Sequence, residues 1–213
     1  MTSPVDLFDE KENRILEAGR YGDFKKALED SGCKKCVLCQ SRTRLVVDRG
    51  NPEACVVLIG EAPGESEDLK GRAFVGRSGK LLDELMRQAG FDTDSDSLIM
   101  NVVKCRPPDN RAPRQEEADA CGPYFRKQLS LLKPKLIILL GATALKHLPG
   151  MKKHPPMRQM IGEFFSHADY PQARFIVFYH PAYLLRDPRK KADMVEPIRR
   201  FMIEWIRVRP ERS

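Results

Sequence analysis

The sequence predicts an α/β fold, a three-layer α/β/α sandwich with a central four-stranded parallel sheet. Four short apolar runs, each followed by a polar or glycine-rich loop, are typical of strands buried on both faces of a parallel sheet. Between the runs lie segments with helical spacing of apolar residues, and strands that alternate with helices indicate a parallel sheet covered by helices. The four strands are predicted at residues 55–59, 98–103, 136–140 and 175–179.

Helices are predicted between and after these strands. Leucines with helical spacing predict a helix over residues 78–89. A second helix is predicted over 115–132, in which Pro123 predicts a kink or a break. A short helix follows Gly141, and an amphipathic helix over 195–208 closes the chain.

The remaining segments are predicted to be irregular or variable. Residues 1–30 are polar with a roughly helical period and form a variable N-terminal helical segment, while residues 31–208 form a single domain. The segments GEAPGESED and HPAYLLRDP are predicted to be loops, because glycine and proline interrupt regular structure. No regular structure is predicted for residues 151–170.

The composition indicates a globular protein that works away from membranes. The chain has 213 residues, of which 41% are hydrophobic and 31% are charged. No apolar run approaches the roughly 20 residues that a membrane helix needs, and the first residues do not resemble a secretory signal. We therefore expect a cytoplasmic location and no membrane partner. The net charge of +7 favours a polyanionic partner, although charge alone is a weak indication.

Six cysteines in such a chain favour metal binding over disulfide bonds. Cys33, Cys36 and Cys39 lie close together, and Cys105 and Cys121 lie near a predicted loop and in a predicted helix. Four thiolates suit either a zinc ion or a [4Fe–4S] cluster, and the spacing alone does not distinguish the two. The sixth cysteine opens a buried strand and is expected to be a small core residue.

The loops at the carboxyl ends of the strands are the expected site of function, because ligands of open parallel sheets bind there. Three of these loops are polar, proline-rich and distinctive. They follow the first, second and fourth strands and read GEAPGESED, NVVKCRPPDNR and HPAYLLRDP.

These loops resemble the signature blocks of the family 4, iron–sulfur uracil-DNA glycosylases. The blocks are GEAPGESEDLKGRAFVGRSGKLL, NVVKCRPPDNRAP and HPAYLLRDP, and a C-x2-C pair before Arg-Thr also matches. The resemblance covers residues 30–205 or so. It implies a monomeric enzyme that flips uracil out of double- or single-stranded DNA and hydrolyses its N-glycosidic bond, which initiates base excision repair. A chain of the same fold that binds DNA through an iron–sulfur or zinc site without glycosylase activity is the alternative.

The resemblance also implies a [4Fe–4S] cluster and selects its ligands. In the family the second cysteine lies six residues before the arginine of Arg-Thr, as Cys36 does before Arg42. The implied ligands are therefore Cys33, Cys36, Cys105 and Cys121, with Cys39 in place of Cys33 as the alternative. The cluster is expected to be structural, since nothing in the sequence suggests a redox reaction.

The base pocket is expected to read the edge of uracil. A carboxamide can accept a hydrogen bond from uracil N3–H and donate one to O4, and Asn101 ends the second strand, where the resemblance also assigns this role. Phe74 is the candidate for stacking on the flipped base, with packing into the core as the alternative. By resemblance, Gly60 and Ala62 also line the pocket and Glu67 crowds out a thymine methyl group, unless the glutamate belongs to a solvated acidic loop.

Two residues are predicted to act on the reaction itself. Cleavage leaves negative charge on uracil O2, and a donor from His180 would stabilise that charge. Glu61 would position or deprotonate the attacking water, or shield the cationic sugar.

The DNA contacts are predicted around the same loops. Leu184 is the candidate for an apolar wedge that enters the gap left by the flipped nucleotide. Arg186 would contact phosphates, and Asn110 and Arg111 would touch the DNA backbone or the pocket. A phosphate-binding loop is excluded as an alternative, because neither G-x-x-x-x-G-K-[ST] nor G-x-G-x-x-G follows the first strand.

Overall fold

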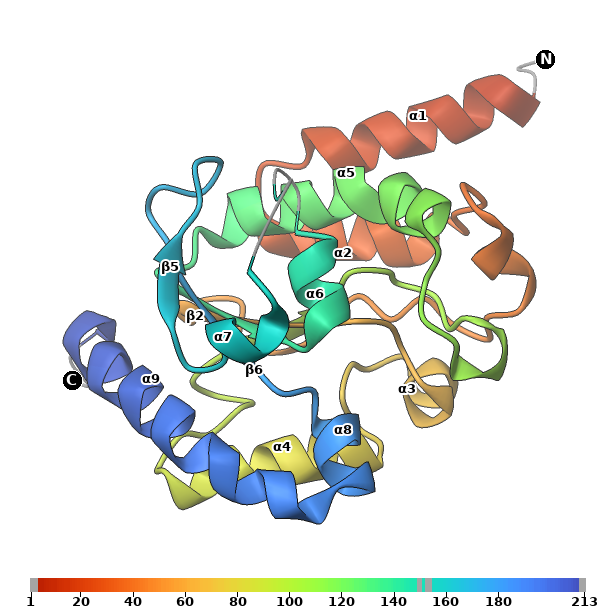
Figure 1. Cartoon of the computed structure of the whole chain (residues 1–213). Helices are drawn as coiled ribbons and strands as arrows, with labels where there is room; N and C mark the ends of the chain where they lie inside the picture. Colours follow the sequence, from red (N-terminus) through yellow and green to blue (C-terminus); the bar gives the residue numbers. More distant parts are fainter. Residues whose placement is uncertain (1–3, 149–150, 152–154, 211–213) are drawn as a thin grey trace.

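The computed structural model describes residues 4–148, 151 and 155–210, and it is organised around one six-stranded sheet (Figure 1). The strand order is β1-β3-β2-β4-β6-β5. The four middle strands are parallel and confirm the four predicted runs: β3 (Leu98–Asn101), β2 (Val56–Gly60), β4 (Leu136–Leu140) and β6 (Arg174–Phe178).

The predicted strand number was too low, because two short strands extend the sheet at its edges. β1 (Arg49–Gly50) pairs with β3 and β5 (Phe164–Ser166) pairs with β6, both antiparallel. Two or three residues are too few to show the alternation by which a strand is recognised in a sequence. The sheet is therefore mixed, with a parallel centre and antiparallel edges.

Helices cover both faces of the sheet and make the expected three layers (Figure 1). On one face lie α5 and α6, with α1 and α2 beyond them, and on the other lie α4, α8 and α9. The helices of the first face are α1 (Pro4–Glu17), α2 (Tyr21–Asp30), α5 (Gln115–Leu132), α6 (Ala142–Lys146) and α7 (Met157–Met160). The others are α3 (Glu65–Lys70), α4 (Arg77–Gln88), α8 (Pro181–Arg186) and α9 (Val195–Val208), with the short 3₁₀ turns η1 (Val37–Gln40), η2 (Pro108–Asn110) and η3 (Pro188–Met194).

Alternate residues of the central strands face the two helical layers. In β2, Val57 and Ile59 pack with α5 and α6, whereas Val56 and Leu58 pack with α4 and α9. Successive side chains of a strand point to opposite faces, so a strand covered on both sides must be apolar throughout. Fully burying each such side chain contributes about 1.5–3 kcal/mol, which explains why these runs were recognisable in the sequence.

Helices α3 and α8 occupy segments that were predicted to be loops. α8 begins directly after His180 with Pro181 at its first position, where proline's missing N–H costs no hydrogen bond. In α3, Asp68 accepts hydrogen bonds from the main-chain N–H groups of Thr43 and Arg44 at 2.9 and 3.3 Å. Both helices have only six residues, so their apolar periodicity is too short to stand out.

Two other predictions are corrected by the structure. α5 continues through Pro123 without a break, although the proline removes one internal hydrogen bond. The segment 151–170 contains α7 and β5 rather than being irregular, while residues 152–154 lie outside the described residues.

The N-terminal helices α1 and α2 pack on the outside of α5. Ile15, Phe24 and Leu28 form a small buried cluster with Val47 and Tyr124. A buried polar network lies beside this cluster: the Tyr21 hydroxyl donates to Asp48 at 2.5 Å and accepts from Gln128 at 2.8 Å. In the part of the chain that the structure describes, no helix has both the length and the apolar character needed to cross a bilayer.

Candidate active site

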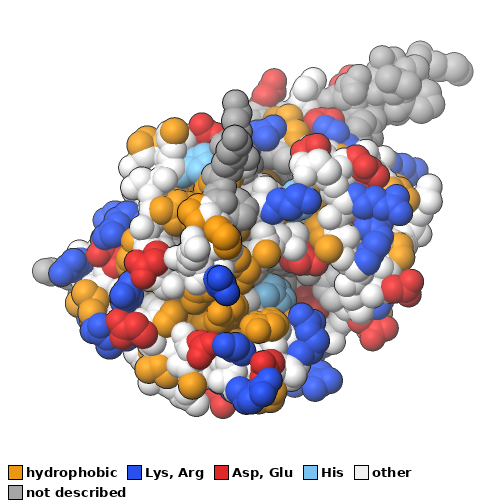
Figure 2. All heavy atoms as spheres, viewed as in Figure 1, with side chains coloured by type: hydrophobic (Ala, Val, Ile, Leu, Met, Phe, Trp, Pro, Cys, Tyr) orange, Lys and Arg blue, Asp and Glu red, His pale blue; other side chains and the backbone are white. Residues whose placement is uncertain are grey.

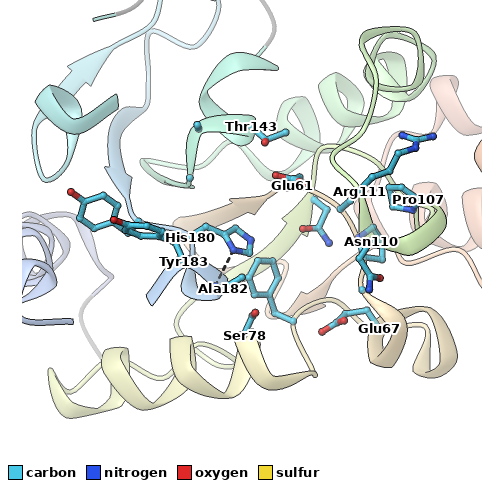
Figure 3. A pocket seen from close by; sticks show the side chains of 18 of the residues that line it. Glu61, Glu67, Ser78, Pro107, Asn110, Arg111, Thr143, His180, Ala182 and Tyr183 are labelled. Atoms are coloured by element: carbon cyan, nitrogen blue, oxygen red, sulfur yellow. Dashed lines mark hydrogen bonds between the residues drawn. The ribbon is translucent and has the colours of Figure 1, made fainter. Parts of the chain in front are cut away.

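A cleft of about 670 Å³ opens at the carboxyl ends of the parallel strands. Figure 2 shows its mouth, a hollow lined by apolar side chains with a histidine within it and lysine and arginine side chains around it. Most of the predicted site residues line this cleft, namely Glu61, Ala62, Glu67, Phe74, Asn101, Asn110, Arg111, His180 and Arg186. They come from the three segments that follow β2, β3 and β6 (Figure 3), so the fold brings together residues that lie far apart in the sequence.

Asn101 lies at the end of β3 with its side chain buried in the cleft. Only 1% of the residue is exposed, and neither its Oδ1 nor its Nδ2 has a hydrogen-bond partner. A buried amide without partners costs free energy, about 1–3 kcal/mol for each unpaired group. The amide is therefore oriented for a ligand that offers one donor and one acceptor side by side.

Phe74 and Gly60 form the wall next to this amide. A Cβ atom on Gly60 would lie 2.5 Å from both Asn101 Oδ1 and the ring of Phe74, so only glycine allows these two groups to approach. Phe74 is 5% exposed, belongs to the core on the α4 side of the sheet and also lines the cleft. Its ring thus packs into the core and also borders the cleft, and its stacking on a base stays a prediction.

His180 follows β6 and faces the cleft from the side of α8 (Figure 3). Its Nδ1 accepts a hydrogen bond from the Ala182 N–H at 3.1 Å. Burial, with a smaller contribution from Arg186, lowers the pKa of His180 to about 4. The imidazole is therefore neutral at physiological pH, and because Nδ1 is the acceptor, Nε2 carries the proton.

The two acidic residues of the first loop have different surroundings. Glu61 lies at the end of β2 near Thr143 of α6 (Figure 3). Glu67 lies in α3, and its Oε1 accepts the main-chain N–H of Gly76 at 2.7 Å. The half-buried position of Glu67 in the cleft argues against a purely solvated acidic loop.

The second loop places Asn110 and Arg111 differently. Asn110 lines the cleft, and its Oδ1 accepts from Arg106 Nε at 2.8 Å. The guanidinium of Arg111 binds both carboxylate oxygens of the buried Glu117, at 2.6 and 2.8 Å. Arg111 thus ties the loop after β3 to α5 through this ion pair. Arg186 at the end of α8 is exposed at the cleft rim.

The predicted wedge residue Leu184 is not at the surface. It is 1% exposed and packs in the core on the α4 side of the sheet, because the turn of α8 directs it inward against α4. A side chain in this position cannot enter a DNA duplex without leaving the core. The expectation that Leu184 lies exposed as a wedge is therefore not met in the described conformation, and its neighbours Tyr183 and Leu185 are larger apolar residues of α8 that are partly exposed.

Replacing Leu184 with alanine is accordingly expected to lower the free energy of unfolding by about 2–5 kcal/mol, the usual cost of a large-to-small change in a core. Urea denaturation followed by circular dichroism measures this change. Leu69→Ala is the matched control, because that leucine is 59% exposed and should change stability little. A stability of Leu184→Ala equal to that of the control would show that the leucine is not a core residue.

Five cysteines surround a second, smaller cavity between α2 and α5. They are Cys33, Cys36, Cys39, Cys105 and Cys121. Burial raises the pKa of Cys105 to about 12 and that of Cys121 to about 11, and the guanidinium of Arg42 donates to Cys105 Sγ at 3.3 Å. Within the described residues, no three metal-ligating side chains lie close enough together to hold a single ion. Four of these thiols are the predicted ligands, and the fifth, Cys39, shares their cavity.

Several cleft residues were not predicted from the sequence. They are Pro63, Gly64, Ser78, Pro107, Gly141, Ala142, Thr143, Met157, Tyr179, Ala182 and Tyr183. Thr143 follows β4, whose loop appeared chemically bland, although the rule that ligands bind at strand carboxyl ends applies to it equally. Met157 carried no signal, since α7 is brought to the cleft by the tertiary fold alone.

Comparison with known proteins identifies the family. A family model of the uracil DNA glycosylase superfamily matches residues 47–202. A type-4 uracil-DNA glycosylase of Sulfurisphaera tokodaii is 38% identical over 84% of this chain and 82% of its own length. Another, of Thermotoga maritima, is 41% identical over 82% of this chain and 85% of its own length.

This chain belongs to the type-4 uracil-DNA glycosylases of that superfamily. The resemblance inferred from the three sequence blocks is therefore confirmed. A type-5 uracil-DNA glycosylase of Thermus thermophilus is also similar, at 33% identity over 57% of this chain and 60% of its own length. The two type-4 relatives thus match a larger part of this chain than the type-5 relative does.

Proposed function

We propose that this protein removes uracil from DNA by capturing the flipped base in the cleft and hydrolysing its N-glycosidic bond. The observation that carries the proposal is the amide of Asn101, which is buried in the cleft with both polar atoms unpaired. Uracil N3–H would donate to Oδ1, and uracil O4 would accept from Nδ2. Cytosine presents the opposite donor and acceptor at these two positions, so the same amide disfavours it.

The other pocket residues would complete the recognition of uracil. Phe74 stacks on the base, and such stacking is worth roughly 1–3 kcal/mol. Gly60 leaves room for the ring and the amide beside it. Glu67, fixed by the Gly76 N–H, faces the C5 edge and excludes the methyl group of thymine, while Ala62 lines the adjacent wall.

In the reaction, the bond from C1′ to N1 breaks, uracil leaves as an anion, and a water oxygen bonds to C1′. His180 donates from Nε2 to uracil O2 while negative charge develops there; this assignment is supported by its lowered pKa and by the Ala182 N–H that occupies Nδ1. Glu61 orients or deprotonates the attacking water, or shields the cationic sugar, and the proton that the water loses goes to Glu61 or to the departing uracil anion. Both residues therefore act in the transition state more than in binding.

We assign a [4Fe–4S] cluster to Cys33, Cys36, Cys105 and Cys121, with Cys39 as an alternative to Cys33. The cavity ringed by five thiols supports this assignment, and Arg42 beside Cys105 favours thiolates in that position. The cluster would supply structural ties rather than redox chemistry. Its ligands connect the segment after α2 with the loop after β3 and with α5.

The expected DNA contacts follow the cleft rim. Arg186 is exposed there and would contact phosphates, while Asn110 would approach the DNA backbone. We further propose that the protein acts as a monomer, as its resemblance to the family implies. A cytoplasmic setting would keep the five clustered thiols reduced.

The function is tested by a uracil-excision assay beside an absorbance spectrum of freshly purified protein. We expect cleavage of double- and single-stranded DNA that contains uracil, none of the same DNA with thymine or cytosine, and a broad band near ~400 nm from thiolate-to-iron charge transfer. Failure to cut uracil DNA would overturn the glycosylase proposal. A colourless protein with one bound zinc ion would overturn only the assignment of the cluster.

The choice of ligands predicts which cysteine variants lose the most unfolding free energy. Cys105→Ser is expected to lower the unfolding free energy far more than Cys39→Ser, because binding energy of a structural metal group is part of the folding energy. Thermal denaturation together with iron content measures both effects. Cys55→Ser is the matched control, since that half-buried thiol lies directly before β2 and not in the cavity. Equal losses for Cys105→Ser and Cys39→Ser would mean that Cys39 is a ligand.

A further inference from the structure

The main chain of Phe74 has a conformation that most residues avoid. Its φ angle is 53°, in the left-handed region that costs an ordinary residue roughly 1–2 kcal/mol. Its carbonyl group is directed into the first turn of α4, where a Cβ atom on Gly79 would lie 1.7 Å from the Phe74 oxygen. The ring of Phe74 lines the cleft with this strained backbone, and other contacts must stabilise such a conformation.

Arg49 supplies such a contact from the edge strand β1. Its side chain is 5% exposed, and Nη1 donates to the carbonyl oxygen of Phe74 at 2.8 Å. The guanidinium also binds Asp83 of α4, at 2.5 and 3.2 Å, and the Thr93 hydroxyl at 2.9 Å. Because the guanidinium is planar and held by these partners, the direction of its bond to Phe74 is fixed.

Lys104 binds the main-chain carbonyl group of Asn101 in the same way as Arg49 binds that of Phe74. Lys104 is fully buried, and its Nζ donates to the carbonyl oxygen of Asn101 at 2.8 Å. Asn101 and Phe74 are the two side chains that meet over Gly60. The pocket wall is thus built from two residues whose carbonyl groups are each bound by a buried cation.

We propose that Arg49 is a positioning residue for uracil recognition: by binding the carbonyl group of Phe74, it holds the aromatic ring in place before the base arrives. The inference rests on the proposed role of Phe74 as the stacking residue. Among the described residues, those that line the cleft do not include Arg49, so it acts through Phe74 and not on the base. A ring fixed in advance costs less entropy when the base binds.

The test measures capture of the base separately from chemistry. The probe is a duplex with a 2′-fluorinated uridine analogue that resists hydrolysis, and the reference is the same duplex with thymine. The ratio of the two affinities reports capture of the flipped base. We expect Arg49→Met to lower this ratio about tenfold, within the range of a stacking contact, and to leave affinity for the thymine duplex nearly unchanged.

A double-mutant cycle distinguishes positioning from general destabilisation. If Arg49 acts through the ring, Arg49→Met should have no further effect on the ratio in a Phe74→Ala background. The matched control is Thr93→Val, which removes hydrogen bonds to Arg49 and Asp83 but keeps the bond from Arg49 to Phe74. Because Asp83 still holds the guanidinium of Arg49 through two hydrogen bonds, Thr93→Val should leave the ratio unchanged, even where it lowers stability.

Each outcome decides the inference. A wild-type ratio for Arg49→Met, or losses that add in the double variant, would overturn the positioning role while the role of Phe74 stands. A wild-type ratio for Phe74→Ala would overturn the stacking role and this inference together, whereas uracil excision tests the glycosylase function independently. Should Arg49→Met leave the charge of Asp83 uncompensated and fail to fold, Arg49→Met combined with Asp83→Leu removes both charges of that ion pair and provides the same comparison.

Discussion

Replacing His180 with alanine is expected to slow uracil excision by about 10²–10³-fold in single-turnover experiments, the usual loss when one donor to a developing anion is removed. The affinity for uracil-containing DNA should change only a few-fold, because the interaction forms chiefly in the transition state. Glu61→Gln is expected to be slower than wild type by a smaller factor, because part of the driving force lies in the leaving group.

The control for this variant is His167→Ala. His167 is buried and its Nδ1 accepts the N–H of Asp169 at 3.2 Å, so it repeats the local contact of His180 outside the cleft. We expect it to alter stability but not the rate of the bound complex. If His180→Ala instead weakens DNA binding and leaves the bound rate intact, the histidine is a DNA contact and has no part in the chemistry.

The lowered pKa of His180 predicts how the reaction depends on pH. Burial holds this pKa near 4, below the ordinary value, so the imidazole stays neutral from neutral pH down to about pH 5. The single-turnover rate should therefore show no break near pH 6.5 from this group. Stability should fall as the pH drops from about 6.5 towards 4, because the unfolded chain binds the proton first. A rate break near pH 6.5 that disappears in His180→Gln would contradict the neutral assignment.

Replacing Asn101 with aspartate is expected to slow uracil excision by about 10²-fold, since an unpaired or repelled polar group in a buried site costs about 1–3 kcal/mol. A carboxylate can accept from uracil N3–H but repels O4, which the amide nitrogen would have bound. A protonated carboxyl group could serve the reversed edge of cytosine. We therefore also expect measurable excision of cytosine by the variant, at a low rate.

Single-turnover assays on duplexes with one uracil or one cytosine measure both effects. Asn13→Asp is the matched control, because it makes the same change of charge on the exposed surface of α1 and should leave both rates unaltered. If Asn101→Asp cuts uracil as fast as the wild-type protein does, Asn101 does not read the base.

The amino-acid sequence by itself determined the central sheet and the place of the cleft. Strands β2, β3, β4 and β6 must be buried on both faces, so each is a continuous apolar run that can be recognised without a structure. The carboxyl ends of parallel strands meet at one edge, so the polar loops that follow them could be expected to form one site. Glu61, Asn101 and His180 are adjacent to strand ends, and for that reason they were found.

Only the tertiary structure decided which segments that are distant in the chain contact one another. The adjacent leucines Leu184 and Leu185 are chemically equivalent in the sequence, and the packing of α8 on α4 determines that Leu184 is the buried one. The edge strand β1 has two residues and exists because β3 offers it main-chain partners. The contact of Arg49 with Phe74 spans 25 positions of the chain. Such contacts depend on the relative placement of whole elements, which no local pattern of residue types specifies.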